Sequence, residues 1–194
     1  MSRYEARGPE PTSPRPTAAG TRPATPPVSH PSAPRPLLPR IRVAALLLSE
    51  GQVLLVRHTK GGRHHWLLPG GGVARGEGLE EALVRELREE LGAAGEVVGP
   101  PLALLETISP DAGRERHTVH IVFPALLSES TGTTATVDPA VKELRWFRTD
   151  ELGPLDVRPP IQGLLASWST LDLSRHRDDW PPLVHQRCPW TPEP

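Results

Sequence analysis

The sequence predicts a mixed α/β fold, in which helices pack against a mixed β-sheet. The chain has 194 residues, which is enough for one ordinary domain with tails. Stretches with the pattern of β-strands outnumber helical stretches, and the two kinds alternate irregularly along the chain. This order favours a mixed sheet over a doubly wound parallel sheet, in which strands and helices would alternate regularly.

The strands are predicted from short apolar runs bounded by turn residues. Residues 41–49 and 52–58 form the first two, and the Glu50-Gly51 pair between them indicates a hairpin. Residues 65–73 read as a short strand that runs into the glycine-rich turn "PGGG". Further strand-like segments are residues 94–99, 102–109, 117–127 and 141–150.

A helix is predicted from about Leu79 to Leu91, and a shorter one near residues 160–169. At about 100° per residue, Leu79, Ala82 and Leu83 share one stripe, which we expect to be buried. The opposite face, with Glu81, Arg85 and Arg88, is expected to be solvated surface carrying an i,i+4 Glu–Arg pair.

Carboxylates continue the apolar stripe of this helix. Relative to Leu79, Glu86 lies at roughly 340° and Glu90 at roughly 20°, with Glu89 beside them at roughly 280°. Ionised carboxylates at the edge of a core are costly unless they are paired or bind a cation. Mg²⁺ prefers oxygen ligands, so these glutamates are candidate metal ligands, and paired surface charges are the alternative. The "PGGG" turn would let the backbone approach phosphate or metal.

The segments on either side of the predicted domain are rich in proline. Residues 1–39 hold almost no large apolar side chains, so we expect them to be disordered. The domain is predicted to span residues 40–170, followed by a Pro/Trp-rich tail at residues 171–194. Whether Trp180 and Trp190 of this tail pack onto the domain is left open by the sequence.

Composition restricts the partners and the compartment. The net charge of −1 gives no field that would favour nucleic acid or an anionic membrane. The longest apolar run, residues 43–48, is far too short to span a bilayer. The single cysteine, Cys188, excludes an internal disulfide and fits a reducing compartment, and no secretory signal is apparent. We therefore expect a cytoplasmic protein without membrane or specific nucleic-acid partners.

The stretch "GGVARGEGLEEALVRELREELGA", Gly71 to Ala93, resembles the Nudix box. The pattern is Gly, five residues, Glu, seven residues, Arg-Glu, an apolar residue, one residue, Glu-Glu, one residue, Gly and an apolar residue. Only Ala93 departs from it, being smaller than the usual aliphatic residue. The matching positions are Gly71, Glu77, Arg85, Glu86, Leu87, Glu89, Glu90 and Gly92.

The resemblance implies a Nudix fold, with a mixed β-sheet sandwiched between helices (α/β/α). It also implies an enzyme that hydrolyses a phosphoanhydride in a nucleoside diphosphate linked to another group, with Mg²⁺ or Mn²⁺ as cofactor. By position, Glu86, Glu89 and Glu90 would be the catalytic, metal-binding residues, one of the last two would help to deprotonate water, and the Gly71 backbone would add a ligand.

Other residues of the box, Glu77, Arg85 and Gly92, would hold the motif together by the same resemblance. An acidic residue in a later loop often completes such sites, and Asp138, Glu129 and Glu115 are candidates.

Residues outside the box bear on the substrate. Arg57 could bind phosphate, and Trp66 could stack on a base or pack in the core. ADP-ribose, NDP-sugars and (deoxy)nucleoside triphosphates all stay open as the small-molecule substrate. The alternative function is a nucleotide-sensing module that binds without turnover. A homodimer is possible, because dimers are common among ADP-ribose-type members of the family.

Overall fold

The computed structural model describes residues 38–60, 62–111, 114–128, 141–174 and 180–189. The two α-helices among these residues are α1 (Leu79–Leu91) and α2 (Gln162–Trp168), and a 3₁₀ turn, η1, spans Thr149–Glu151. The strands are β1 (Arg40–Leu46), β2 (Leu48–Ser49), β3 (Gln52–Lys60), β4 (Arg63–Leu67), β5 (Gly95–Val97), β6 (Ala103–Asp111), β7 (Arg114–Leu127), β8 (Val141–Arg148) and β9 (Val184–Cys188).

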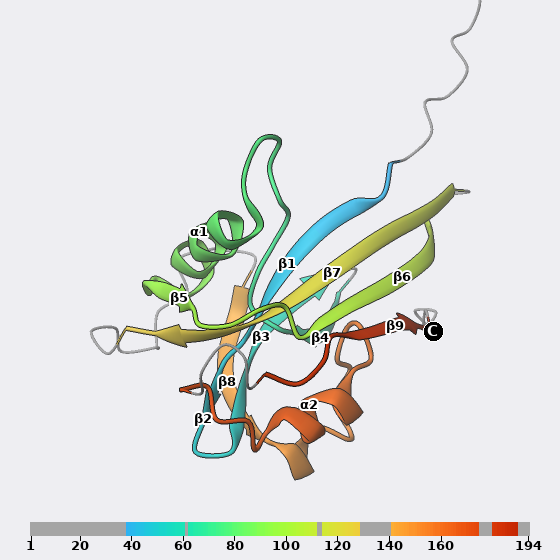
Figure 1. The fold of residues 1–194 in the computed structure, drawn as a ribbon. Coiled ribbons are helices and arrows are strands. Elements are labelled where there is room, and N and C mark those ends of the chain that lie inside the picture. Colours follow the sequence, from blue (N-terminus) through green and yellow to red (C-terminus); the bar gives the residue numbers. More distant parts are fainter. Residues whose placement is uncertain (1–37, 61, 112–113, 129–140, 175–179, 190–194) are drawn as a thin grey trace, which may run out of the picture. The chain divides into compact units, whose positions relative to one another are not determined.

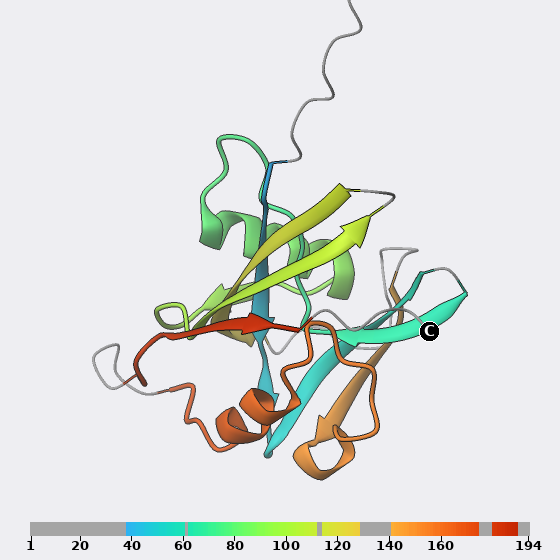
Figure 2. The same cartoon turned by 90° about the vertical axis from the view of Figure 1, so that its right-hand side faces the viewer.

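These strands form two sheets instead of one. In the first, the order is β1-β7-β6-β9, and β5 adds to β7; the β1–β7 and β6–β9 pairs are parallel, while β5 and β6 run antiparallel to β7. In the second, β3 pairs antiparallel with β2, β4 and β8. Parallel and antiparallel pairing in one sheet, with helices on both sides, confirms the predicted mixed α/β fold (Figures 1 and 2).

Alternation along the central strands creates two cores. Val43 and Ala45 of β1 face the core that contains α1, whereas Ala44 and Leu46 face the core that contains α2. Successive side chains of a strand point to opposite faces, so one strand supplies both cores. The strands therefore lie between α1 and α2, as Figure 1 shows.

The first hairpin is confirmed. Leu48 pairs with Val53 and Ser49 with Gln52, across a turn made by Glu50 and Gly51. Both turn residues have positive φ angles, 50° and 74°. Two successive left-handed residues are the signature of the tight turn that matches the twist of an antiparallel pair.

The helix α1 has the predicted bounds, but its buried stripe is rotated from the predicted one. Leu79 is exposed, at 37%, whereas Leu87 and Leu91 are fully buried together with Ala82 and Leu83. Leu87 lies against Gly95 of β5, where a Cβ would overlap its side chain. The packing of α1 on β1 and β5 thus centres the stripe on Leu83 and Leu87 and leaves Leu79 outside it.

The C-terminal segment contributes a strand that the sequence analysis did not predict. β9 extends the first sheet by pairing with β6, and Cys188 at its end is buried, which raises the pKa of its thiol. Trp180 is buried as well and lies against Gly99, where a Cβ would overlap the indole. Trp190 lies outside the described residues. Among the helices that the structure describes, none is long and apolar enough to cross a membrane.

Candidate active site

The glycine-rich turn is held along the free edge of β1. The Ala45 N–H donates to the Pro69 carbonyl at 2.8 Å, and the Val43 N–H donates to the Gly71 carbonyl at 3.0 Å. These bonds fix residues 69–71 as if they were a further strand of the sheet, next to the C-terminal half of α1. The turn is therefore a rigid part of the site.

Two glycines of this turn are closely enclosed, and at Gly70 the backbone itself requires glycine. Gly70 has a φ of 138°, and a Cβ there would overlap the Val43 carbonyl oxygen. A Cβ at Gly71 would overlap the carboxylate of Glu86. The turn is thus enclosed by the backbone of β1 at Gly70, which only glycine permits, and by the Glu86 carboxylate of α1 at Gly71, where a larger residue would displace that carboxylate.

The boundaries of α1 are set by glycines and by a local carboxylate. The Gly78 N–H, just before the helix, donates to Glu81 at 2.9 Å. Gly92 ends the helix in the left-handed conformation, with a φ of 64°, and its N–H donates to the Arg88 carbonyl at 3.0 Å. A left-handed glycine is a common helix terminator, and here it fixes where the last carboxylates of the helix stand.

Arg85 connects the loop before α1 to the carboxylates of the helix. Its guanidinium donates to both oxygens of Glu77 at 2.8 and 3.0 Å and to the Gly72 carbonyl at 3.0 Å. It also donates to Glu86 at 2.8 Å and to Glu89 at 3.2 Å. Helical spacing alone placed Arg85 on an ordinary solvated face, which is wrong, because Glu77 and Gly72 reach this face from the preceding loop; the resemblance, by contrast, grouped Arg85 with Glu77.

This pairing shifts the pKa values of both partners. The hydrogen bond from Arg85, aided by one from the Ala74 N–H, lowers the pKa of Glu77 to about 2. The hydrogen bonds to Glu77 and Glu86 raise the pKa of Arg85. Glu77 is consequently ionised at neutral pH, and the loop is tied to the helix by opposite charges.

Glu90 is held differently from the other carboxylates. Its side chain is buried, at 3% exposure, and one carboxylate oxygen accepts a hydrogen bond from the Gly70 N–H at 2.7 Å. The other oxygen lies 3.5 Å from Nε2 of His58 on β3. Glu86 and Glu90 thus approach the glycine-rich turn together, whereas Glu89, which is 54% exposed, lies on the solvent side with Arg85.

A cation that the sequence analysis missed lies beside these carboxylates. Arg42 of β1 donates to the Gly70 carbonyl. Burial lowers the pKa of Arg42, and the nearby carboxylates of Glu90 and Glu86 partly offset this effect. The available signal was an arginine next to the apolar run of β1, but its proximity to α1 depends on how the turn lies along the strand.

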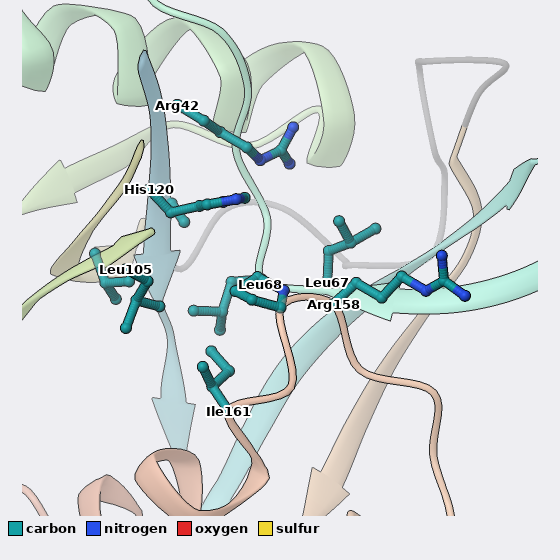
Figure 3. A pocket seen from close by; sticks show the side chains of 10 residues that line it. Arg42, Leu67, Leu68, Leu105, His120, Arg158 and Ile161 are labelled. Atoms are coloured by element: carbon teal, nitrogen blue, oxygen red, sulfur yellow. The ribbon is translucent and has the colours of Figure 1, made fainter. Parts of the chain in front are cut away.

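Arg42 also borders a hollow between the two sheets (Figure 3). His120 of β7 points into the hollow from the same side, and burial, followed by the charge of Arg42, lowers the pKa of His120 to about 4. Arg158, which is paired with Asp156 at 2.9 Å, lies at the opposite end. The other lining side chains are apolar: Ala44, Leu67, Leu68, Leu105, Val122, Pro159 and Ile161.

Arg57 and Trp66, the predicted substrate-binding residues, lie away from the carboxylates. Arg57 is paired with Glu143 at 3.0 Å and stands 5.9 Å from the centre of the Trp66 ring. Trp66 packs edge-on against Phe147 and belongs to the core of α2. Both residues are therefore on the face of the second sheet that points away from α1.

The donor atoms around the turn fit a divalent cation. Within the described ranges, no three His, Cys, Asp or Glu side chains form a metal-binding group. Mg²⁺ does not require one, because waters and substrate phosphates commonly complete its shell around one or two carboxylates. Glu86 lies against Gly71 in a space that a Cβ would fill, and Glu90 is buried beside Gly70. Asp138 and Glu129, and the side chain of Glu115, lie outside the described part.

A glycine-rich turn followed by a helix with inward carboxylates, in an α/β fold, defines a loop–helix site of the kind that suits a divalent cation and phosphate. The chain belongs to the Nudix family, since the NUDIX domain matches residues 38–168. This confirms the resemblance found in the box, and with it the assignment to the hydrolases that act on phosphoanhydride bonds.

Two named relatives support the assignment to the family. The chain is 33% identical over 165 residues to the putative 8-oxo-dGTP diphosphatase 2 of Mycobacterium tuberculosis, covering 78% of this chain and 100% of the relative. It is 33% identical over 121 residues to the ADP-ribose pyrophosphatase of Methanocaldococcus jannaschii, covering 61% and 68%.

Solved structures agree with the fold. A MutT NUDIX hydrolase from Burkholderia pseudomallei is 31% identical, with a TM-score of 0.54 over 68% of this chain and 98% of that one. A NUDIX hydrolase from Nitrosomonas europaea, at 22% identity, has a TM-score of 0.59 over 83% and 84%, and so supports the fold alone.

Proposed function

We propose that this protein is a Mg²⁺- or Mn²⁺-dependent pyrophosphohydrolase that cleaves a nucleoside diphosphate linked to another group. The observation that carries the proposal is the approach of two carboxylates, Glu86 and Glu90, to a glycine-rich turn that is fixed along β1. Such a site combines oxygen donors for a hard cation with exposed backbone for a phosphate chain.

Glu86 and Glu90 would hold the cation, with Glu89 as a further ligand from the solvent side. The Gly71 carbonyl could add a ligand only through its second lone pair, because it already accepts the Val43 N–H. When bound, the cation neutralises phosphate charge and lowers the pKa of a bound water. Glu77 and Arg85 keep the loop and the helix in register, and Gly92 fixes the helix end. Their contribution is to hold the carboxylates in place before substrate arrives.

The remaining steps belong to side chains of the chain itself. Glu89 or Glu90 would take the proton from the attacking water, and attack would be in line at one phosphorus. Arg42 is placed to contact a phosphate, since its guanidinium lies between the carboxylates and the hollow. A cation in this position stabilises the negative charge that shifts onto the leaving phosphate.

The hollow beside Arg42 has room for about one water molecule, so it does not serve as the pocket for a base. The part of the substrate that does not react would therefore bind outside this hollow. Arg57 and Trp66 would contact only a substrate long enough to reach the far side of the second sheet.

Nucleoside triphosphates are the first substrates to test. The chain covers the whole length of a relative named as an 8-oxo-dGTP diphosphatase, and about two thirds of one named as an ADP-ribose pyrophosphatase. This difference in coverage supports triphosphates over ADP-ribose as the substrate. NDP-sugars remain among the substrates to be tested.

The test is a product-mass screen of the purified protein against nucleoside triphosphates, 8-oxo-dGTP, ADP-ribose, NDP-sugars and dinucleoside polyphosphates, with and without Mg²⁺. Reaction in ¹⁸O-water identifies the phosphorus that is attacked. Glu90→Gln is the test variant, and Glu80→Gln, an exposed change on the same helix, is the control. We expect metal-dependent cleavage in the wild type and the control only. Cleavage without metal, or unchanged in Glu90→Gln, contradicts the proposal; nucleotide binding without turnover supports a sensing module instead.

A further inference from the structure

The region where β3 approaches the end of α1 contains a contact that the proposed reaction does not use. Glu90 is the one charged side chain that is buried in the part of the chain that the structure describes. Only one of its oxygens has a hydrogen bond, from the Gly70 N–H. The other oxygen faces His58 of β3, with Nε2 at 3.5 Å.

The ring of His58 has no competing partner at this nitrogen. Its Nε2 is buried and forms no hydrogen bond. At 3.5 Å, the contact with Glu90 is at the outer limit of a hydrogen bond, and hydrogen bonds in catalytic sites are often long before substrate binds. A buried donor without a partner gains free energy by closing this distance to the carboxylate.

His58 lies on the face of β3 that points toward α1. Leu54 and Val56 of β3 belong to the core that contains α1, and side chains two residues apart on a strand share a face, so His58 follows them. The register shift between β3 and β8 at this point leaves the extra residue on β8 and not on β3. On the neighbouring strand, His65 lies across from His58 with a ring-to-ring distance of 6.2 Å, which limits how far the ring can move.

We propose that His58 is a positioning residue that fixes the carboxylate of Glu90 by donating its Nε2–H to the oxygen not bound by Gly70. The inference rests on the proposed function, in which Glu90 is a metal-binding carboxylate. Each carboxylate oxygen has two lone pairs. One donor on each oxygen sets the plane of the group and leaves a second lone pair on each free toward the turn. His58 thus orients the carboxylate of Glu90, as Arg85 orients the carboxylate of Glu86.

Two variants separate positioning from a merely structural role. His58→Leu removes the donor but keeps an apolar side chain in the site, whereas His58→Gln restores a neutral N–H donor. His64→Leu is the control, because His64 is on the same hairpin but is exposed and contacts Thr59 at 2.9 Å. The measurements are kcat, KM for the nucleotide, and Mn²⁺ affinity by electron paramagnetic resonance without nucleotide.

We expect His58→Leu to weaken Mn²⁺ binding and lower kcat by roughly 10- to 100-fold, the usual effect of losing a residue that orients a metal ligand. KM should change little, and His58→Gln should recover most of both losses. Wild-type values in His58→Leu overturn the proposal. Equal losses in the Leu and Gln variants overturn it as well, because they indicate a structural role.

A measurement on the metal-free protein separates this inference from the proposed function. ¹⁵N NMR of the histidine ring at pH 8 reports which nitrogen carries the proton. The Nε2–H tautomer is expected for His58, with a signal that moves in Glu90→Gln but not in Glu80→Gln. A proton on Nδ1, or an unmoved signal, overturns the contact. An intact contact in a protein without turnover contradicts the proposed function and supports the contact itself.

Discussion

The carboxylates at the end of α1 are held in two different ways. Glu86 and Glu89 are paired with Arg85, a cation of their own helix that remains 34% exposed. Glu90, one residue further along, is buried and is held by the backbone of Gly70 and the ring of His58. The first arrangement is local in sequence, and the second joins three separate segments.

The difference predicts unequal sensitivity to substitution. Exposed ion pairs contribute little to stability and are screened by salt. A buried carboxylate has a high desolvation cost, so its few partners must be in place. The exposed pair of Glu89 with Arg85 should therefore tolerate change, whereas the region of Glu90 and Gly70 should not.

The largest effect is expected at Gly70. In Gly70→Ala, the added Cβ would overlap the Val43 carbonyl at a φ of 138° that alanine rarely adopts. We expect the free energy of unfolding to fall by roughly 3 kcal/mol or more. Urea unfolding measures it, with Gly72→Ala as control, since a Cβ at Gly72 meets nothing within 4 Å. Equal stability of the two variants would show that the turn is not confined by β1.

The next effect concerns activity at the two kinds of carboxylate. Glu90→Gln should lower kcat by on the order of 100-fold or more, as expected for the loss of a preorganised charged group. Glu89→Gln should lower it less, because its carboxylate is mostly exposed and bound by Arg85. Metal-dependent turnover of each variant is the measurement. A greater loss in Glu89→Gln would reverse the comparison and make Glu89 the more important residue.

The pH dependence of stability tests the ion pair between Glu77 and Arg85. The folded protein lowers the pKa of Glu77 from 4.5 to about 2, so the unfolded chain binds the proton more readily. The stabilisation from Glu77 is therefore present above about pH 4.5 and is lost as the pH falls toward 2. Melting temperatures of the wild type and Glu77→Gln should converge over this interval. A constant difference between them would show that Glu77 does not stabilise the fold through its charge.

The smallest effect is expected for stability at Glu89. Its i,i+4 pair with Arg85 should contribute about 0.3–0.5 kcal/mol, and less in high salt. Chemical unfolding of Glu89→Gln at low and at 1 M salt would measure both quantities. A loss above about 1 kcal/mol would place Glu89 in a more buried and more constrained environment than its exposure indicates.

Local features of the site could be predicted from the sequence. The bounds of α1, the hairpin at Glu50-Gly51 and the inward direction of Glu90 follow from residue type and helical spacing. The predicted burial of Leu79 was wrong. Periodicity shows that one face of the helix is apolar, but it does not show which residues of that face pack against the sheet. Helical spacing alone put Arg85 on solvated surface, because spacing cannot show that Glu77 and the Gly72 carbonyl reach it from a loop without periodic structure.

Features that depend on distant segments could not be predicted. Arg42 approaches the carboxylates only because the glycine-rich turn lies along β1. His58 lies on the α1 face of β3 by alternation with Leu54 and Val56, but its approach to Glu90 depends on how α1 packs against the sheet. β9 has apolar residues only at its two ends, Val184 and Cys188, and so lacks the alternation that would identify a strand.

The most direct test of the proposed function is a crystal structure of the protein with Mn²⁺ and a non-hydrolysable nucleotide analogue. An anomalous difference map locates the metal independently of the coordinates. We predict a peak about 2.1 Å from carboxylate oxygens of both Glu86 and Glu90, beside Gly71. A metal bound elsewhere, with Glu86 still on Arg85 and Glu90 still enclosed by Gly70 and His58, would contradict the central claim that these two carboxylates form the catalytic metal site.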